Sequence, residues 1–231
     1  MIFRLSALSL LLLFYTSTAQ SLARFTKIIS LGCDCEVATQ LNKYHLRHEA
    51  YPFDWIRTFV FNRLTQLIKN DFSHFLHAPL LVKTQHTVVN KQYFIAFVHD
   101  FPTLQHPSYQ KSDQEFTGII VPNFLHFVPQ AQEKYARRIT RFKAALNSPG
   151  PILFIRSQYI QPADAAEFVQ LISRLYPRLN FTLAVVSSQQ YPQEQWKIPH
   201  VTAIQKTRPA GKLWFSEDQW TEILKKLQLI N

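Results

Sequence analysis

Two cysteines separated by a single residue have the clearest capacity for chemistry in this chain. Cys33 and Cys35 are its only cysteines, and they lie in KIISLGCDCEVATQL, where an apolar run gives way to a helical pattern. A thiol at the start of a helix is expected to have a lowered pKa, because the helix N-terminus favours the nucleophilic thiolate. The pattern places Cys35 at the helix start and Cys33 in the preceding turn. We therefore predict that Cys35 is a nucleophile and that Cys33 is a small buried residue.

Three other apolar runs also end in polar residues. FIAFV is followed by His99 and Asp100, ILFI by Arg156, and LAVV by two serines. If these strands are parallel to the one before the cysteines, their carboxyl ends meet at one sheet edge, which is where ligands bind in open parallel sheets. The alternative is that strand ends are polar simply because they are exposed.

The hydrophobic periodicity predicts a single α/β domain with a mixed, partly parallel sheet flanked by helices. The clearest unit is ILFI, a helix starting at Pro162, and FTLAVV, whose crossover length implies two parallel strands. Further strands are predicted at Ile28 to Leu31 and Gln92 to Val98, and a basic helix at about Gln130 to Leu146.

Two more helices are predicted from their apolar faces. One follows the irregular segment AYPFDWI, and the last begins at Ser216 and Gln219, which have capping-box spacing. The inward residues of the first are predicted to be Val60, Leu64, Leu67 and Ile68, and those of the last to be Trp220, Ile223, Leu224 and Leu227.

The N-terminal segment MIFRLSALSLLLLFYTSTAQ has a positive residue, an apolar run and small residues in the order typical of a secretory signal peptide. We predict that residues 1–19 are removed and that residues 20–231 form one exported domain, in a periplasm or outside the cell. The alternative is an uncleaved segment that anchors the protein in a membrane.

The net charge of +10 favours contact with anionic surfaces such as phospholipid head groups or acidic glycans. Part of the charge lies on one stripe of the basic helix, formed by Lys134, Arg137, Arg138 and Arg141. This stripe is either a surface that binds an anionic partner or, as we favour, a solvated face. It lacks interleaved exposed aromatic residues, so no specific nucleic-acid binding is predicted.

Several segments, in this order, resemble the uncharacterised family described as putative papain-like cysteine peptidases. They are ISLGCDCEVATQL, LRHEAYPFDWI, LIKNDFSHFL, HDF, KYARRITRF and ILFIR, and SLGxxC and PFDW are the most specific of them. The resemblance covers roughly Ile28 to Ser187. It implies a papain-like α+β fold as the alternative to the α/β architecture, in which a helical lobe carries the cysteine and an antiparallel sheet carries the histidine.

The resemblance implies Cys35 as the nucleophile and His99 as the base that takes its proton. Backbone N–H groups at the helix start would stabilise the oxyanion, and a third polar group would orient the imidazole. Asp113 is our choice for that group, because it follows His99 by a loop that can fold back, with Asp100 and Asn123 as rivals. The substrate is expected to be a peptide or an amide.

Three further residues are candidates for substrate binding. Asp54 and Trp55, in PFDW, shape the cleft or, as we favour, anchor the chain entering the next helix, and Arg156 can hold an anionic group. His74 and His77 have helical spacing but no third ligand nearby in sequence, so we expect surface histidines, no metal site and no cofactor.

Two functions of other classes stay open. One is a non-catalytic module that binds an anionic glycan or lipid head group through Arg156 and the basic helix. The other is a thiol oxidoreductase, in which Cys33 and Cys35 form a strained and easily reduced disulfide.

Overall fold

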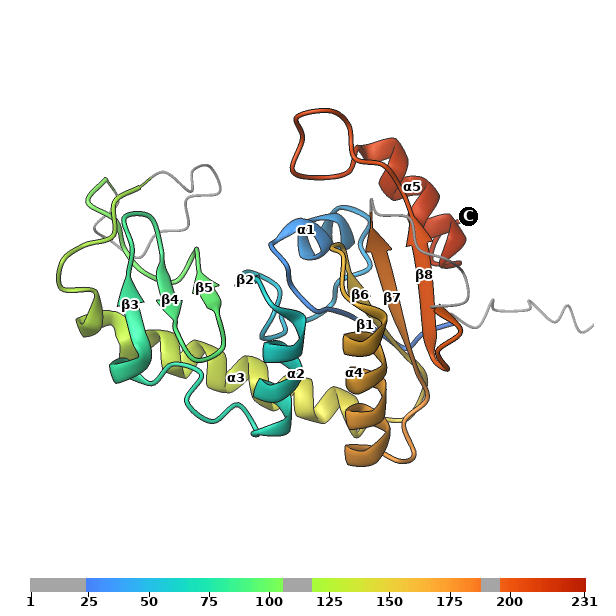
Figure 1. The fold of residues 1–231 in the computed structure, drawn as a ribbon, viewed down its shortest axis with the longest axis horizontal. Coiled ribbons are helices and arrows are strands. Elements are labelled where there is room, and N and C mark those ends of the chain that lie inside the picture. Colours follow the sequence, from blue (N-terminus) through green and yellow to red (C-terminus); the bar gives the residue numbers. More distant parts are fainter. Residues whose placement is uncertain (1–23, 106–117, 188–195) are drawn as a thin grey trace, which may run out of the picture.

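A parallel sheet forms one half of the protein, in a computed structural model that describes residues 24–105, 118–187 and 196–231 (Figure 1). Its strand order is β1-β6-β7-β8, and every neighbouring pair is parallel. The strands are β1 (Lys27–Ser30), β6 (Ile152–Arg156), β7 (Phe181–Ser187) and β8 (Val201–Gln205). The predicted signal segment lies outside the described residues.

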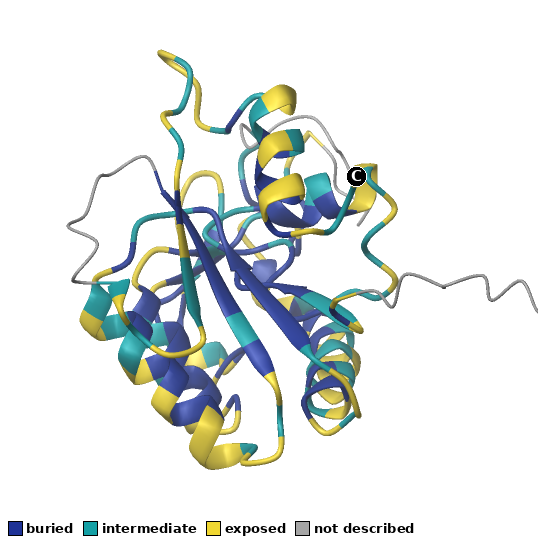
Figure 2. Cartoon of the chain, turned by 90° about the vertical axis from the view of Figure 1, so that its right-hand side faces the viewer, coloured by how far each residue is buried: buried dark blue, intermediate teal, exposed yellow. Residues whose placement is uncertain are grey.

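Helices cover both faces of this sheet, so β6 is buried throughout and β7 is buried at every residue except Thr182 (Figure 2). Alternate residues of β6 belong to different clusters: Leu153 and Ile155 pack with α1 and α5, whereas Ile152 and Phe154 pack with α4. The helices are α1 (Glu36–Lys43), α4 (Pro162–Leu175) and α5 (Glu217–Lys226). The predicted β-α-β unit is β6-α4-β7.

A separate antiparallel sheet forms the other half, with the order β2-β5-β4-β3. Its short strands are β2 (Arg57–Thr58), β3 (Leu81–Lys83), β4 (Val88–Asn90) and β5 (Ile95–Phe97). The remaining helices are α2 (Phe61–Lys69), η1 (Ala78–Leu80), η2 (Phe124–Phe127) and α3 (Val128–Leu146). One core cluster includes residues of both sheets and of α3, which joins the two halves (Figure 1).

The predicted α/β class is confirmed, and the parallel and antiparallel strands belong to two sheets. Two local predictions were wrong. Val60 does not point inward: it is the N-cap of α2 and is 40% exposed. Strand β5 is shorter than predicted, because the Asn90 side chain accepts hydrogen bonds from the N–H groups of Gln92 and Tyr93 and folds these residues into a turn.

Candidate active site

A tight turn delivers Cys35 from β1 to the start of α1. Gly32 and Cys33 both have positive φ angles, 73° and 89°, which reverse the chain directly after the strand. A Cβ atom on Gly32 would lie 3.1 Å from the Thr58 hydroxyl, so the turn also needs the small residue for close packing. The Cys33 N–H donates to Thr58 Oγ1 at 3.0 Å. Cys35 thereby becomes the N-cap of α1, at the carboxyl edge of the parallel sheet.

The two thiols are free, but their exposure is the reverse of the prediction. Cys35 is buried, with 4% of its surface exposed, whereas Cys33 is only partly buried. Burial, and after it the Asp34 carboxylate, raise the pKa of Cys35 to about 11. Burial also raises the pKa of Cys33, while the Arg156 guanidinium opposes this shift. Neither thiol is therefore a preformed thiolate in this conformation.

The expected lowering of the Cys35 pKa is absent for a local reason. Asp34 Oδ1 accepts a hydrogen bond from the Glu36 N–H at 2.8 Å, so a carboxylate already occupies the positive end of α1. Its negative charge lies beside the thiol and disfavours a second negative charge there. A nucleophilic Cys35 consequently needs a base that removes its proton during attack.

Replacing Asp34 with asparagine is therefore expected to make Cys35 more reactive. Asparagine keeps a capping oxygen but removes the charge, so the pKa of Cys35 falls and the thiolate fraction at a given pH rises. The alkylation rate of Cys35 by iodoacetamide at about pH 8 should rise about three- to tenfold, followed in a Cys33→Ser background by mass spectrometry. Asp164→Asn, in the first turn of α4, is the matched control and should leave the rate unchanged. An unchanged rate in Asp34→Asn would contradict this electrostatic account.

His99 comes from the other sheet, two residues after β5, and it is exposed. Its ring packs edge-on against Trp55, with 6.1 Å between the ring centroids. Trp55 lies two residues before Arg57 of β2, and Arg57 pairs with Ala96 of β5. The PFDW segment thus leads into the strand that neighbours the histidine.

Asp54 has the anchoring role rather than a place on an open surface. Its side chain is 2% exposed and accepts hydrogen bonds from Arg47 Nε and Nη2, at 3.1 and 2.9 Å, and from the Tyr51 N–H, at 2.9 Å. The same Arg47 guanidinium lies over the Trp55 ring, 5.3 Å from its centroid. Arg47 and Asp54 therefore fix the tryptophan that contacts His99.

The candidates for the third polar group have different surroundings. Asp113 lies outside the described residues. Asp100 is fully buried, accepts a 2.8 Å hydrogen bond from the Tyr135 hydroxyl and forms an ion pair with Lys134, so its carboxylate is held by α3. Asn123 is exposed just before η2. Asp100 thus has a structural role that sequence spacing did not reveal.

Arg156 is fully buried, so in this conformation its side chain offers no surface to a substrate. Its Nη1 donates to Leu31 O at 3.0 Å, and its Nη2 donates to Thr58 O and Gln158 Oε1, both at 2.7 Å. Nη1 also contacts Thr58 Oγ1. In place of the expected contact with a substrate, Arg156 links β6 to Leu31, which follows β1, and to Thr58 of β2.

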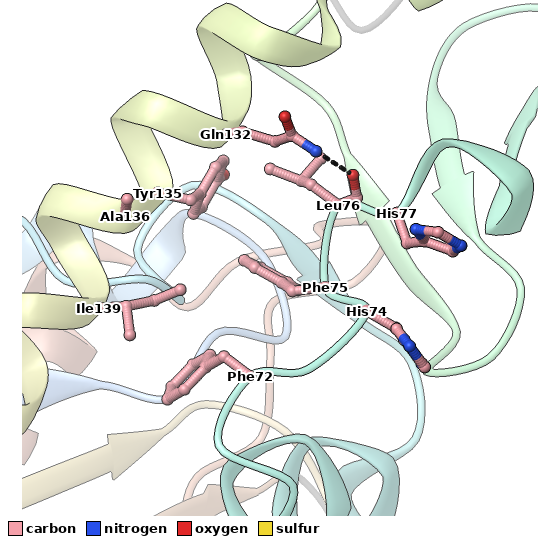
Figure 3. Close-up of a pocket in the computed structure, with 9 residues that line it drawn as sticks. All are labelled: Phe72, His74, Phe75, Leu76, His77, Gln132, Tyr135, Ala136 and Ile139. Atoms are coloured by element: carbon pink, nitrogen blue, oxygen red, sulfur yellow. Dashed lines mark hydrogen bonds between the residues drawn. The ribbon is translucent and has the colours of Figure 1, made fainter.

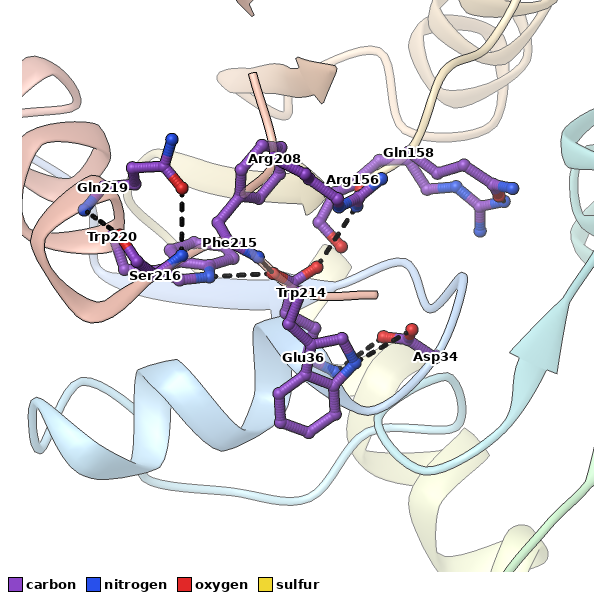
Figure 4. Close-up of polar contacts among 11 residues, drawn as sticks. Asp34, Glu36, Arg156, Gln158, Arg208, Trp214, Phe215, Ser216, Gln219 and Trp220 are labelled. Carbon is purple, nitrogen blue, oxygen red and sulfur yellow. Dashed lines mark hydrogen bonds and ion pairs between the residues drawn. The ribbon is translucent and has the colours of Figure 1, made fainter. Parts of the chain in front are cut away.

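A buried carboxylate directly after Cys35 was missed by sequence analysis. Glu36 has no exposed surface and accepts hydrogen bonds from the Phe215 N–H at 2.6 Å and from Trp220 Nε1 at 3.0 Å (Figure 4). Arg208 forms an ion pair with it at 3.4 Å. Asp34, on the other side of Cys35, accepts a 3.1 Å hydrogen bond from the indole N–H of Trp214. The C-terminal segment thus holds both residues that flank the cysteine.

The basic stripe on α3 is only partly exposed. Arg137 is exposed, but Lys134, Arg138 and Arg141 are only partly exposed. Lys134 pairs with Asp100, and the Arg138 guanidinium lies 5.2 Å from the centroid of the Tyr135 ring. Part of this charge therefore holds α3 against its neighbours.

A shallow cavity of about 280 Å³ lies elsewhere, between α3 and the segment after α2 (Figure 3). Its lining residues include His74, His77, Gln132 and Tyr135, and none of the predicted catalytic residues. His74 and His77 are exposed, as predicted, with 5.2 Å between their ring centroids. Within the described part of the chain, no three His, Cys, Asp or Glu side chains gather as metal ligands.

A protein family and a viral protein are similar to this chain. Within the three described ranges, no helix is both long and apolar enough to span a bilayer. No solved structure matches the chain significantly. An uncharacterized protein of Acanthamoeba polyphaga mimivirus is 30% identical over 187 residues, which cover 69% of this chain and 77% of the viral protein. Residues 26–191, which carry Cys35, the PFDW segment and His99, match the family described as "Putative papain-like cysteine peptidase", and the chain belongs to this family.

Proposed function

We propose that this protein is a cysteine hydrolase that acts on a peptide or an amide, with Cys35 as the nucleophile and His99 as the base. The observation that carries the proposal is the position of Cys35 as the N-cap of α1, at the carboxyl edge of a parallel sheet. The family and the contact between His99 and Trp55 of PFDW support it.

The raised pKa of Cys35 determines how such a reaction proceeds. With a pKa of about 11, only about one thiol in ten thousand is ionised at neutral pH. His99 therefore removes the proton as the sulfur attacks the carbonyl carbon, which is general-base catalysis rather than a resting ion pair. The amine then leaves with that proton, and water hydrolyses the thioester.

Backbone N–H groups at the start of α1 supply the stabilisation of the tetrahedral oxyanion in this proposal. Burial of Cys35, a residue with 4% of its surface exposed, limits the substrate to a group that can reach it, such as an extended chain. The proposal includes export after removal of residues 1–19, because the order of residues in that segment is typical of signal peptides.

The test is the alkylation of folded, reduced Cys33→Ser protein by iodoacetamide from about pH 6 to about pH 11. If His99 acts as the base, Cys35 should react at neutral pH faster than a thiol with a pKa of about 11 allows. In Cys33→Ser/His99→Ala, the rate should instead rise about tenfold per pH unit, following simple ionisation. If both proteins follow simple ionisation, His99 is not the base, and the proposal fails.

A further inference from the structure

A single polar junction links the turn that carries Cys35 to the sheet that carries His99. The carbonyl of Leu31, directly after β1, and the backbone and side chain of Thr58, in β2, meet at the guanidinium of Arg156. The hydroxyl of Thr58 also accepts the Cys33 N–H at 3.0 Å. Three segments from two sheets are thus fixed against one another by two side chains.

The residues of this junction lie only a few residues along the chain, or across one strand pair, from Cys35 and from His99. On one side, Leu31 and Cys33 belong to the turn that ends at Cys35. On the other side, Thr58 pairs with Ile95 of β5, and this strand ends two residues before His99. Because both routes are short and hydrogen-bonded, a shift at the junction changes the separation of the thiol and the imidazole.

The hydrogen-bond geometry explains why residue 156 is an arginine better than a gain in stability does. Within the described residues, no carboxylate lies at ion-pair distance from Arg156, although the side chain is fully buried. Burying a cation without a carboxylate partner carries a large desolvation cost. A planar guanidinium, however, directs several N–H groups at fixed angles, which a lysine or a hydrophobic residue cannot do.

We propose that Arg156 and Thr58 are positioning residues that set the separation of Cys35 and His99 by joining β1, β2 and β6. This inference rests on the proposed function. Neither residue touches the substrate; both act through the placement of the reacting pair. Misplacement of about 1 Å between reacting groups costs about a hundredfold in rate, so a small change at this junction has a large kinetic effect.

The test uses a matched pair of substitutions at Thr58 and p-nitrophenyl acetate as the probe. The sulfur of Cys35 attacks the ester carbonyl, His99 takes the thiol proton, p-nitrophenolate leaves, and an acetyl thioester remains on the protein. Thr58→Val keeps the side-chain shape but removes the hydroxyl, whereas Thr58→Ser retains it. Thr65→Val makes the same change at a buried threonine of α2 and controls for stability.

We expect Thr58→Val to lower the acylation rate constant about ten- to a hundredfold with little change in KM, whereas Thr58→Ser and Thr65→Val stay within about threefold of the parent. Adding His99→Ala to Thr58→Val should cost about tenfold or less, against about a hundredfold in the parent, because the imidazole is already displaced from the thiol. Circular dichroism and thermal unfolding establish that each protein is folded. Arg156→Lys, which keeps the charge but not the planar fork, should behave like Thr58→Val.

Two results would overturn the inference while the proposed function stands: a folded Thr58→Val protein that acylates at the parent rate, or a loss from His99→Ala as large in Thr58→Val as in the parent. If Cys35→Ser shows the same burst of p-nitrophenolate as the parent, the proposed function itself fails, and the positioning role falls with it.

Discussion

Cys35→Ser is expected to abolish hydrolase activity, and Cys33→Ser to leave it nearly intact. The two thiols are two residues apart, but only Cys35 occupies the N-cap of α1, where the backbone N–H groups that follow that of Glu36, which donates to Asp34, can hold an oxyanion. Acyl-enzyme formation with p-nitrophenyl acetate, followed by intact mass, measures the effect directly. A thiol oxidoreductase would instead lose its function equally at either cysteine.

His99→Ala is expected to remove most of the same activity, by about a hundredfold or more. Because the thiol and the imidazole act as one unit, Cys35→Ser/His99→Ala should be no worse than Cys35→Ser alone. His126→Ala, which changes a histidine of η2, is the matched control and should have little effect. An active Cys35→Ser protein would contradict Cys35 as the nucleophile, whereas a folded parent protein whose Cys35 is unreactive at neutral pH would favour a non-catalytic binding module.

The largest effect on stability is expected at Trp220, which is fully buried and donates to Glu36. Trp220→Ala should lower the free energy of unfolding by about 3–5 kcal/mol, because it opens a cavity beneath α5 and removes a donor from a buried carboxylate. Trp220→Phe keeps most of the ring and should cost about 1–3 kcal/mol. Urea denaturation followed by circular dichroism measures both values.

Leu213→Ala serves as the control for this series, because the side chain belongs to the same C-terminal segment but is 77% exposed. Its effect should stay within about 0.5 kcal/mol. If Trp220→Ala were equally mild, α5 would not be a stabilising element of this fold.

Sequence patterns predicted the elements whose signals are local. The capping box of Ser216 and Gln219, the apolar face of α5 and the parallel pair around α4 all follow from residues close together in the chain. Strand β8 was not predicted, because only Ile204 of its five residues is buried and no alternation marks it. Strands β3 and β4, with three residues each, are too short for a periodic signal.

The candidate site was predictable in its position but not in its electrostatics. The apolar run before Gly32 and the helical pattern after it place Cys35 correctly at the start of α1. The pKa of its thiol depends on burial and on the Asp34 carboxylate, and the burial of this side chain does not follow from the local apolar pattern. The same limit applies to Arg156: its strand was predicted, but its partners belong to segments about a hundred residues away in the chain.

The contacts of Glu36 have a consequence for the order in which this protein folds during synthesis. Glu36 and its partner Trp220 are 184 residues apart, so the helix that carries the cysteine leaves the ribosome long before the side chain that completes its surroundings. Contacts of such high sequence separation form late, because a long loop must close first. The nascent chain therefore carries an incompletely assembled thiol site until α5 has been synthesised, which couples the maturation of this site to the synthesis of α5.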